Sequence, residues 1–220
     1  MESSLIIGYI SLALVLIAGG FHVRRVWQGE ITISPVSWFI WFAVSFAILL
    51  SYNSMDTKHE LYVAIGNVIF PGMNFALSFR QKTKVELSKW DYGALILGLV
   101  AMVLWWFVRQ DPTQVQYANY LAILADMCAV IPTFMLVKKN PMVEKPLPWL
   151  IFALGFGIST FAIESDSFAN YVLPIYMFVG AGLIAALQVH YRWKYNIHEK
   201  WYWSVKCKGY WMFASSTFLL

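Results

Sequence analysis

Charged side chains are scarce in this sequence. Only 13% of its 220 residues are Asp, Glu, Lys or Arg, whereas a soluble domain has about 25%. Hydrophobic residues make up 60% of the chain, and most of them fall in seven long runs. These runs use up most of the length and leave no room for a soluble catalytic domain. The runs are 5–21, 34–52, 61–79, 91–108, 115–137, 146–163 and 169–190.

Motifs of soluble enzymes are also missing. The sequence contains no Gly-x-Ser-x-Gly elbow, no His-Glu-x-x-His pair, no phosphate-binding loop and no Cys/His cluster. The two cysteines, Cys128 and Cys207, lie in the fifth run and near the C-terminus, so we expect no disulfide, metal site or cofactor. Run 169–190 has no lysine, which excludes a retinal protein. We therefore predict that the protein is not an enzyme.

Each run is long enough to cross a bilayer core, which takes about 20 residues of helix. The sequence therefore predicts an all-α membrane protein with seven transmembrane helices. A signal peptide is the alternative for the first run, but Glu2 precedes it and Arg24 and Arg25 follow it, which favours a retained helix. The tail 192–220 is apolar but contains Lys206 and Lys208. We expect it to lie along the membrane interface, with an eighth span as the alternative.

The basic residues give the orientation. All but Lys58 and Arg109 of the 16 Lys and Arg residues lie in alternate gaps between the runs or in the tail. Because such residues gather on the cytoplasmic side, the N-terminus is predicted outside and the C-terminus inside, in a plasma (inner) membrane. The net charge of +4 reflects this asymmetry and does not indicate nucleic-acid binding.

An internal repeat relates the first three runs to the last three. A shift of 111 residues places Pro35 on Pro146 and Trp38 on Trp149. Two tandem units of three helices would point in opposite directions, and the single helix 91–108 between them restores the same direction. We predict two parallel three-helix repeats joined by an inverting helix. The divisions are 1–80 for the first repeat, 81–112 for the linker and inverting helix, 113–191 for the second repeat, and 192–220 for the tail.

With this topology, residues 5–190 resemble the SWEET and PQ-loop superfamily. Pro132-Thr133 stands where the family has its Pro-Gln pair, and Pro146 opens the next helix. In the first half Phe21-His22 occupies the Pro-Gln position, so that proline is missing, and glutamine is absent from both positions. The resemblance implies a small-solute transporter that works by alternating access of its two halves. The alternative is a non-transporting membrane receptor or sorting protein of the same fold.

Five prolines are candidate hinges. Of the family's four cytoplasmic hinge prolines, Pro35, Pro132 and Pro146 are present. Pro71 and Pro174 interrupt the third and seventh runs, where a proline removes a backbone hydrogen bond and permits a bend.

Polar residues inside the runs form stripes. Asn67 and Asn74 are seven residues apart in the third run and therefore share one helix face. Asp126 and Thr133 have the same spacing in the fifth run, and Asn170 begins a stripe in the seventh. Since the helices of this fold surround a central path, we predict a shared aqueous cavity in which Asn67, Asn74, Asp126 and Asn170 bind the substrate.

Asp126 is the sharpest candidate. A charge at the centre of a transmembrane helix costs about 2.5–3.5 kcal/mol on insertion scales, and no lysine or arginine lies at matching depth. Asp126 therefore either faces water or is protonated, since burial disfavours the charged form. It could bind a substrate hydroxyl or amine, or carry a coupling proton. The structural alternative is a neutral carboxyl bonded to a helix carbonyl or to Asn67. His22 is interpreted as an interfacial residue near the cytoplasmic end, with a proton relay as the alternative.

Trp38 and Trp149 have two interpretations that stay open. As residues near a membrane face they belong to the aromatic belt, or else they flank the cavity and stack on a planar or sugar-like ligand. The expected partners are the lipid bilayer and a small-molecule solute, without nucleic acid, and a homo-oligomer is left open.

Overall fold

The computed structural model describes residues 2–54, 60–81, 85–109, 114–140, 142–163 and 168–194, which form helices joined by short loops. Within these ranges there is no strand, and the all-α prediction is confirmed. The helices are α1 (Glu2–Gln28), α2 (Pro35–Ser54), α3 (Glu60–Ser78), α4 (Lys89–Val108), α5 (Val115–Lys139), α6 (Pro146–Ser159), the short 3-10 helix η1 (Thr160–Ala162) and α7 (Phe168–Lys194).

Local signals set several helix ends. Pro35 and Pro146 open α2 and α6, at the position where the missing N–H of proline has no helical partner to lose. Ser88 and Asp91 form a reciprocal capping box at the start of α4. The first helix continues beyond its apolar run as far as Gln28. The next residue, Gly29, has a φ of 72°, which suits glycine. The amide of Glu30 then donates to the carbonyl of Arg25, as in a Schellman motif.

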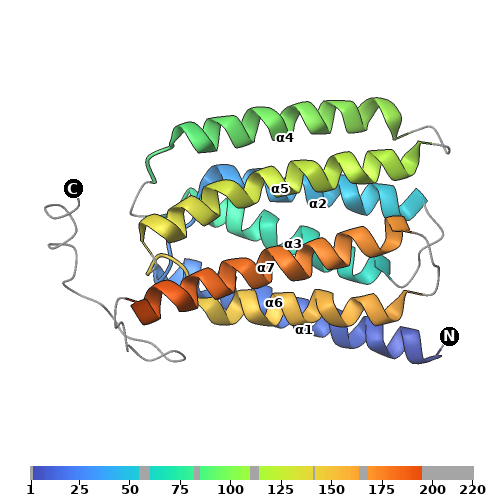
Figure 1. Cartoon of the computed structure of the whole chain (residues 1–220), viewed down its shortest axis with the longest axis horizontal. Helices are drawn as coiled ribbons and strands as arrows, with labels where there is room; N and C mark the ends of the chain where they lie inside the picture. The colour runs from blue at the N-terminus through green and yellow to red at the C-terminus, as the bar shows by residue number, and fades with distance from the viewer. Residues whose placement is uncertain are drawn as a thin grey trace, which may run out of the picture.

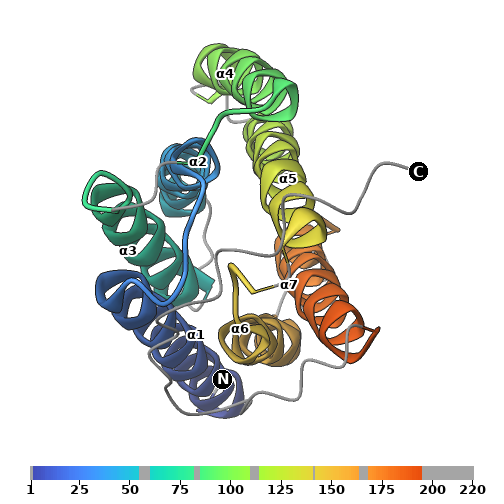
Figure 2. The same cartoon turned by 90° about the vertical axis from the view of Figure 1, so that its left-hand side faces the viewer.

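The long helices lie side by side and alternate in direction along the chain (Figure 1). Viewed end-on, α1–α3 form one group, α5–α7 form another, and α4 stands outside both (Figure 2). Inside the groups, α3 packs against α1 and α2, and α7 packs against α5 and α6. Two contacts join the groups, α1 with α6 and α2 with α5, while α4 rests on α5 and α2.

Four of the described helices are long and apolar enough to cross a membrane: Ser3–Gln28, Lys89–Val108, Tyr120–Lys139 and Asn170–Lys194. The described apolar parts of α2 and α6 are shorter, at Pro35–Ala47 and Pro146–Ala162. The structure is thus compatible with an integral membrane protein, and the crossing of all seven helices stays a prediction.

The outer surface of α4 is apolar. Leu97, Val100, Val103, Trp106 and Phe107 are all exposed on it. Soluble proteins rarely expose a continuous apolar face of this kind. Such a face is compatible with contact to lipid.

Basic residues gather at one end of the bundle. This is the end where α1, α3, α5 and α7 finish and where α2, α4 and α6 begin (Figure 1). Arg109 lies at the opposite end, at the close of α4. Lys58 and residues 195–220 lie outside the described part, so the interfacial tail stays a prediction. The described basic residues at the end where α1, α3, α5 and α7 finish are Arg24, Arg25, Arg80, Lys89, Lys138, Lys139, Lys145, Arg192 and Lys194.

Candidate functional site

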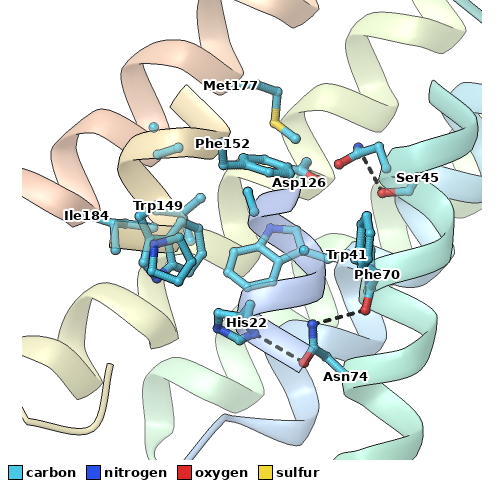
Figure 3. Close-up of a pocket in the computed structure, with 18 of the residues that line it drawn as sticks. His22, Trp41, Ser45, Phe70, Asn74, Asp126, Trp149, Phe152, Met177 and Ile184 are labelled. Carbon is cyan, nitrogen blue, oxygen red and sulfur yellow. Dashed lines mark hydrogen bonds between the residues drawn. The ribbon is translucent and has the colours of Figure 1, made fainter. Parts of the chain in front are cut away.

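A cavity of about 70 Å³ lies among six helices, three from each group. This volume has room for a few water molecules and is far below the 300–1,000 Å³ of pockets that enclose drug-sized ligands. Aromatic and aliphatic side chains form most of its wall, with a few buried polar groups among them (Figure 3). Its lining residues include Ala18, Gly19 and His22 of α1; Trp38, Trp41 and Ser45 of α2; Asn67, Phe70, Pro71 and Asn74 of α3; Asp126 and Val130 of α5; Trp149 and Phe152 of α6; and Tyr176 and Met177 of α7.

The structure brings together five of the six predicted binding residues. Asn67, Asn74, Asp126, Trp38 and Trp149 all line the cavity, although they come from four different helices. Asn170 is buried in the first turn of α7 and is not part of the lining. A role for any of them in binding stays a prediction.

The candidate hinge prolines have different positions. Pro71, Pro132 and Pro174 lie inside α3, α5 and α7, and of these Pro71 lines the cavity. Pro35 and Pro146 are the first residues of their helices. Bending of the helices at these prolines stays a prediction.

Asp126 is only 1% exposed, and its carboxyl group faces the cavity. The Tyr176 hydroxyl of α7 donates to one carboxyl oxygen, Oδ2. The other oxygen, Oδ1, has no hydrogen-bond partner within the described residues. Asn67 instead donates to Ser45, with 3.1 Å between Nδ2 and Oγ. From the sequence, we expected that a structural Asp126 would bond to Asn67 or to a helix carbonyl. In the structure its hydrogen-bond partner is Tyr176.

Three indoles form a cluster beside Asp126. The ring centroids of Trp38 and Trp41 are 4.9 Å apart, and those of Trp41 and Trp149 are 5.9 Å apart. All three are less than a tenth exposed and line the cavity. Trp41 was not among the predicted binding residues, although it lies three residues after Trp38 and therefore on the same helix face.

His22 contacts two polar side chains within the bundle. Its Nδ1 lies 3.1 Å from Oδ1 of Asn74, and its Nε2 lies 3.1 Å from Oε2 of Glu144. The same Glu144 oxygen accepts a hydrogen bond of 3.3 Å from the indole of Trp149. His22 is 4% exposed and Glu144 is 1% exposed. The ring of His22 is therefore enclosed by protein, and its depth at the membrane interface stays a prediction.

The hydrogen bonds of Asn74 indicate how the His22 ring is oriented. The Asn74 amide nitrogen donates to the carbonyl of Phe70 at 3.0 Å, so its oxygen faces His22 and accepts from Nδ1. The other ring nitrogen, Nε2, faces the carboxyl group of Glu144.

Each half of the molecule also anchors the loop that enters its second helix. In the first half, Gln81 donates to the carbonyl of Ile33 at 3.1 Å and accepts from its amide at 2.7 Å. In the second half, the Arg192 guanidinium donates to the carbonyl of Glu144 at 2.8 Å. Both residues of the second anchor follow those of the first by 111 positions, the shift that aligns Pro35 with Pro146.

Comparisons with known proteins give no match: no family model matches the sequence, and neither a curated protein nor a solved structure matches it. The cavity and the packing of the helices are therefore the basis for a functional proposal.

Proposed function

We propose that the protein is an integral membrane transporter of small solutes, in which two parallel three-helix units give alternating access to the cavity. The observation that carries this proposal is the position of the cavity. It lies where the two groups of helices meet, and each group contributes three helices to its wall. Buried polar groups at such a junction are typical of a substrate path.

The packing supports a repeat. If α1, α2 and α3 are exchanged for α5, α6 and α7, the main contacts map onto one another. The α1–α3 and α2–α3 contacts correspond to α5–α7 and α6–α7, and the α1–α6 contact corresponds to α5–α2. The two loop anchors correspond in the same way. In this proposal α4 is the inverting helix, and Pro35, Pro71, Pro132, Pro146 and Pro174 are the candidate hinges.

The proposed orientation follows from the basic end of the bundle. Because lysine and arginine collect on the cytoplasmic side, the ends of α1, α3, α5 and α7 face the cytoplasm and the N-terminus is outside. His22 and Glu144 then lie between the cavity and the cytoplasm. Opening of the cavity toward the cytoplasm requires a change in the His22–Glu144 pairing or in the two loop anchors.

Transport is tested by reconstitution. Purified protein is first screened by thermal unfolding against sugars, nucleosides, vitamins and amino acids, and solutes that stabilise it are then assayed for flux into liposomes at two pH values. We expect flux that is absent from protein-free liposomes. A ligand that binds without crossing would contradict transport and favour the receptor or sorting protein.

The same assay decides the role of Asp126. Asn is nearly the same size as Asp but cannot ionise, so Asp126→Asn keeps the Tyr176 partner and removes the charge. Loss of proton-driven accumulation with intact solute exchange would assign proton coupling to Asp126. Weakened binding at both pH values would assign it to substrate recognition without coupling. Unchanged flux would remove Asp126 from the site.

A further inference from the structure

The cavity has an uncompensated acceptor in its wall. Among the described residues, neither lysine nor arginine lines the cavity, and Asp126 is the only acidic residue in its wall. Glu144, which is not among the lining residues, is paired with His22. An ionised Asp126 therefore leaves the cavity negative. Its Oδ1 is buried and makes no hydrogen bond of good geometry within the described part of the chain, although the Trp41 indole lies near the carboxyl group. A buried anion in this state is strongly stabilised by a cation.

The rest of the wall suits an organic cation better than a metal ion. The indoles of Trp38, Trp41 and Trp149 line the cavity together with Phe70, Phe152 and Tyr176. Figure 3 shows four of these side chains, Trp41, Trp149, Phe70 and Phe152. The negative faces of aromatic rings attract ammonium groups, and tryptophan does so most strongly. A metal ion instead needs several oxygen, nitrogen or sulfur ligands, and the described residues contain no group of three acidic, histidine or cysteine side chains that could hold one.

The size of the cavity limits the occupant. A volume of about 70 Å³ fits a group of a few heavy atoms. A sugar or nucleoside therefore requires the aromatic side chains to move, whereas a small ammonium group does not.

We propose that the cavity binds a small organic ammonium ion, with the cation between the aromatic rings and against Oδ1 of Asp126. The inference rests on the proposed function, because it names the substrate class of the same cavity. Asp126 supplies the counter-charge, the indoles supply the cation–π contacts, and Tyr176 holds the carboxylate in place.

Matched probes test this on the wild-type protein. Methylammonium, tetramethylammonium and choline are compared with 3,3-dimethyl-1-butanol, which has the shape of choline with carbon in place of the charged nitrogen. Binding is measured by calorimetry and thermal unfolding in detergent. We expect at least one of the ammonium ions to bind saturably and the neutral alcohol not to bind. Saturable binding of choline and of the alcohol with equal affinity, or binding by none of the ions, would overturn the proposal.

Charge-matched variants locate the site. Asp126→Asn should weaken ammonium binding by about tenfold or more, as expected for the loss of one charged contact. Glu86→Gln removes the same charge from an exposed residue outside the cavity and should leave binding unchanged. Equal weakening by both variants would overturn the assignment to Asp126, as would solute exchange that survives Asp126→Asn.

Liposome flux separates this inference from the transport proposal. Flux of a neutral solute without ammonium binding would reject the cation and keep the transporter. Ammonium binding that is lost in Asp126→Asn but gives no flux would keep the cation site and reject transport.

Discussion

His22 and Glu144 form a buried pair whose members depend on each other. Each is almost fully enclosed, and each offers the other a partner for a charge or a proton. Breaking a buried pair by removing one member is costly, whereas replacing both members with apolar residues is often tolerated. This asymmetry distinguishes a real pair from two side chains that happen to lie close together.

We therefore expect His22→Leu to lower the free energy of unfolding by about 3–5 kcal/mol. In this variant Glu144 stays buried, and among the described side chains the Trp149 indole is the one hydrogen-bond donor that remains to it. The double variant His22→Leu/Glu144→Leu should recover much of this loss. Denaturant unfolding in detergent measures both. Additive losses in the double variant would show that the two residues are not coupled.

At this scale the sequence identified the polar stripes but not every partner. Asn67, Asn74 and Asp126 could be predicted, because a polar residue inside an apolar run has few reasons to be there other than a polar interior. Glu144 could not be predicted, because it lies in the gap between two apolar runs and precedes Lys145, as a solvated residue would. Only the three-dimensional path of the loop brings it into contact with His22.

At the scale of elements, α1 and α3 approach each other closely at a glycine. A Cβ added at Gly19 would overlap the ring of Phe70, whereas one added at the adjacent Gly20 would meet nothing within 4 Å. Phe70 is a cavity residue, so this contact connects helix packing to the shape of the site.

Adjacent substitutions test that contact. Gly19→Ala should destabilise the protein by about 1–3 kcal/mol, because Phe70 must shift in a packed interior. Gly20→Ala should be neutral or stabilising by up to about 1 kcal/mol, because alanine favours helix. Thermal unfolding of the two variants measures the difference. A similar effect of both would mean that the α1–α3 contact is looser than described.

The helices were easier to predict from the sequence than their ends. Seven apolar runs predicted the seven long helices, since a run of that length has few other structures. The ends moved where polar residues continue a helix. α1 passes through Arg24 and Arg25 as far as Gln28 because nothing stops it before Gly29. Conversely, the run 146–163 ends in η1 rather than as one α-helix.

At the scale of the whole molecule, the proposed orientation rests on the described basic residues, all of which except Arg109 occupy one end of the bundle. Glu86 and Gln114 lie beyond opposite ends of α4 and are both exposed. In a variant without Cys128 and Cys207, we expect Gln114→Cys to react with a membrane-impermeant thiol reagent in intact cells and Glu86→Cys to react only after the membrane is opened. The reverse pattern would contradict the orientation.

The cluster of indoles has an optical consequence. Trp38 and Trp41 belong to α2 in the first half, and Trp149 belongs to α6 in the second, so the 5.9 Å contact between Trp41 and Trp149 bridges the two halves. Rings this close couple their excited states, and the coupling falls steeply as they separate. Any rocking of one half against the other would therefore change the near-ultraviolet circular dichroism of the protein. The molecule thus has a built-in spectroscopic gauge of the distance between its halves, which needs no added label.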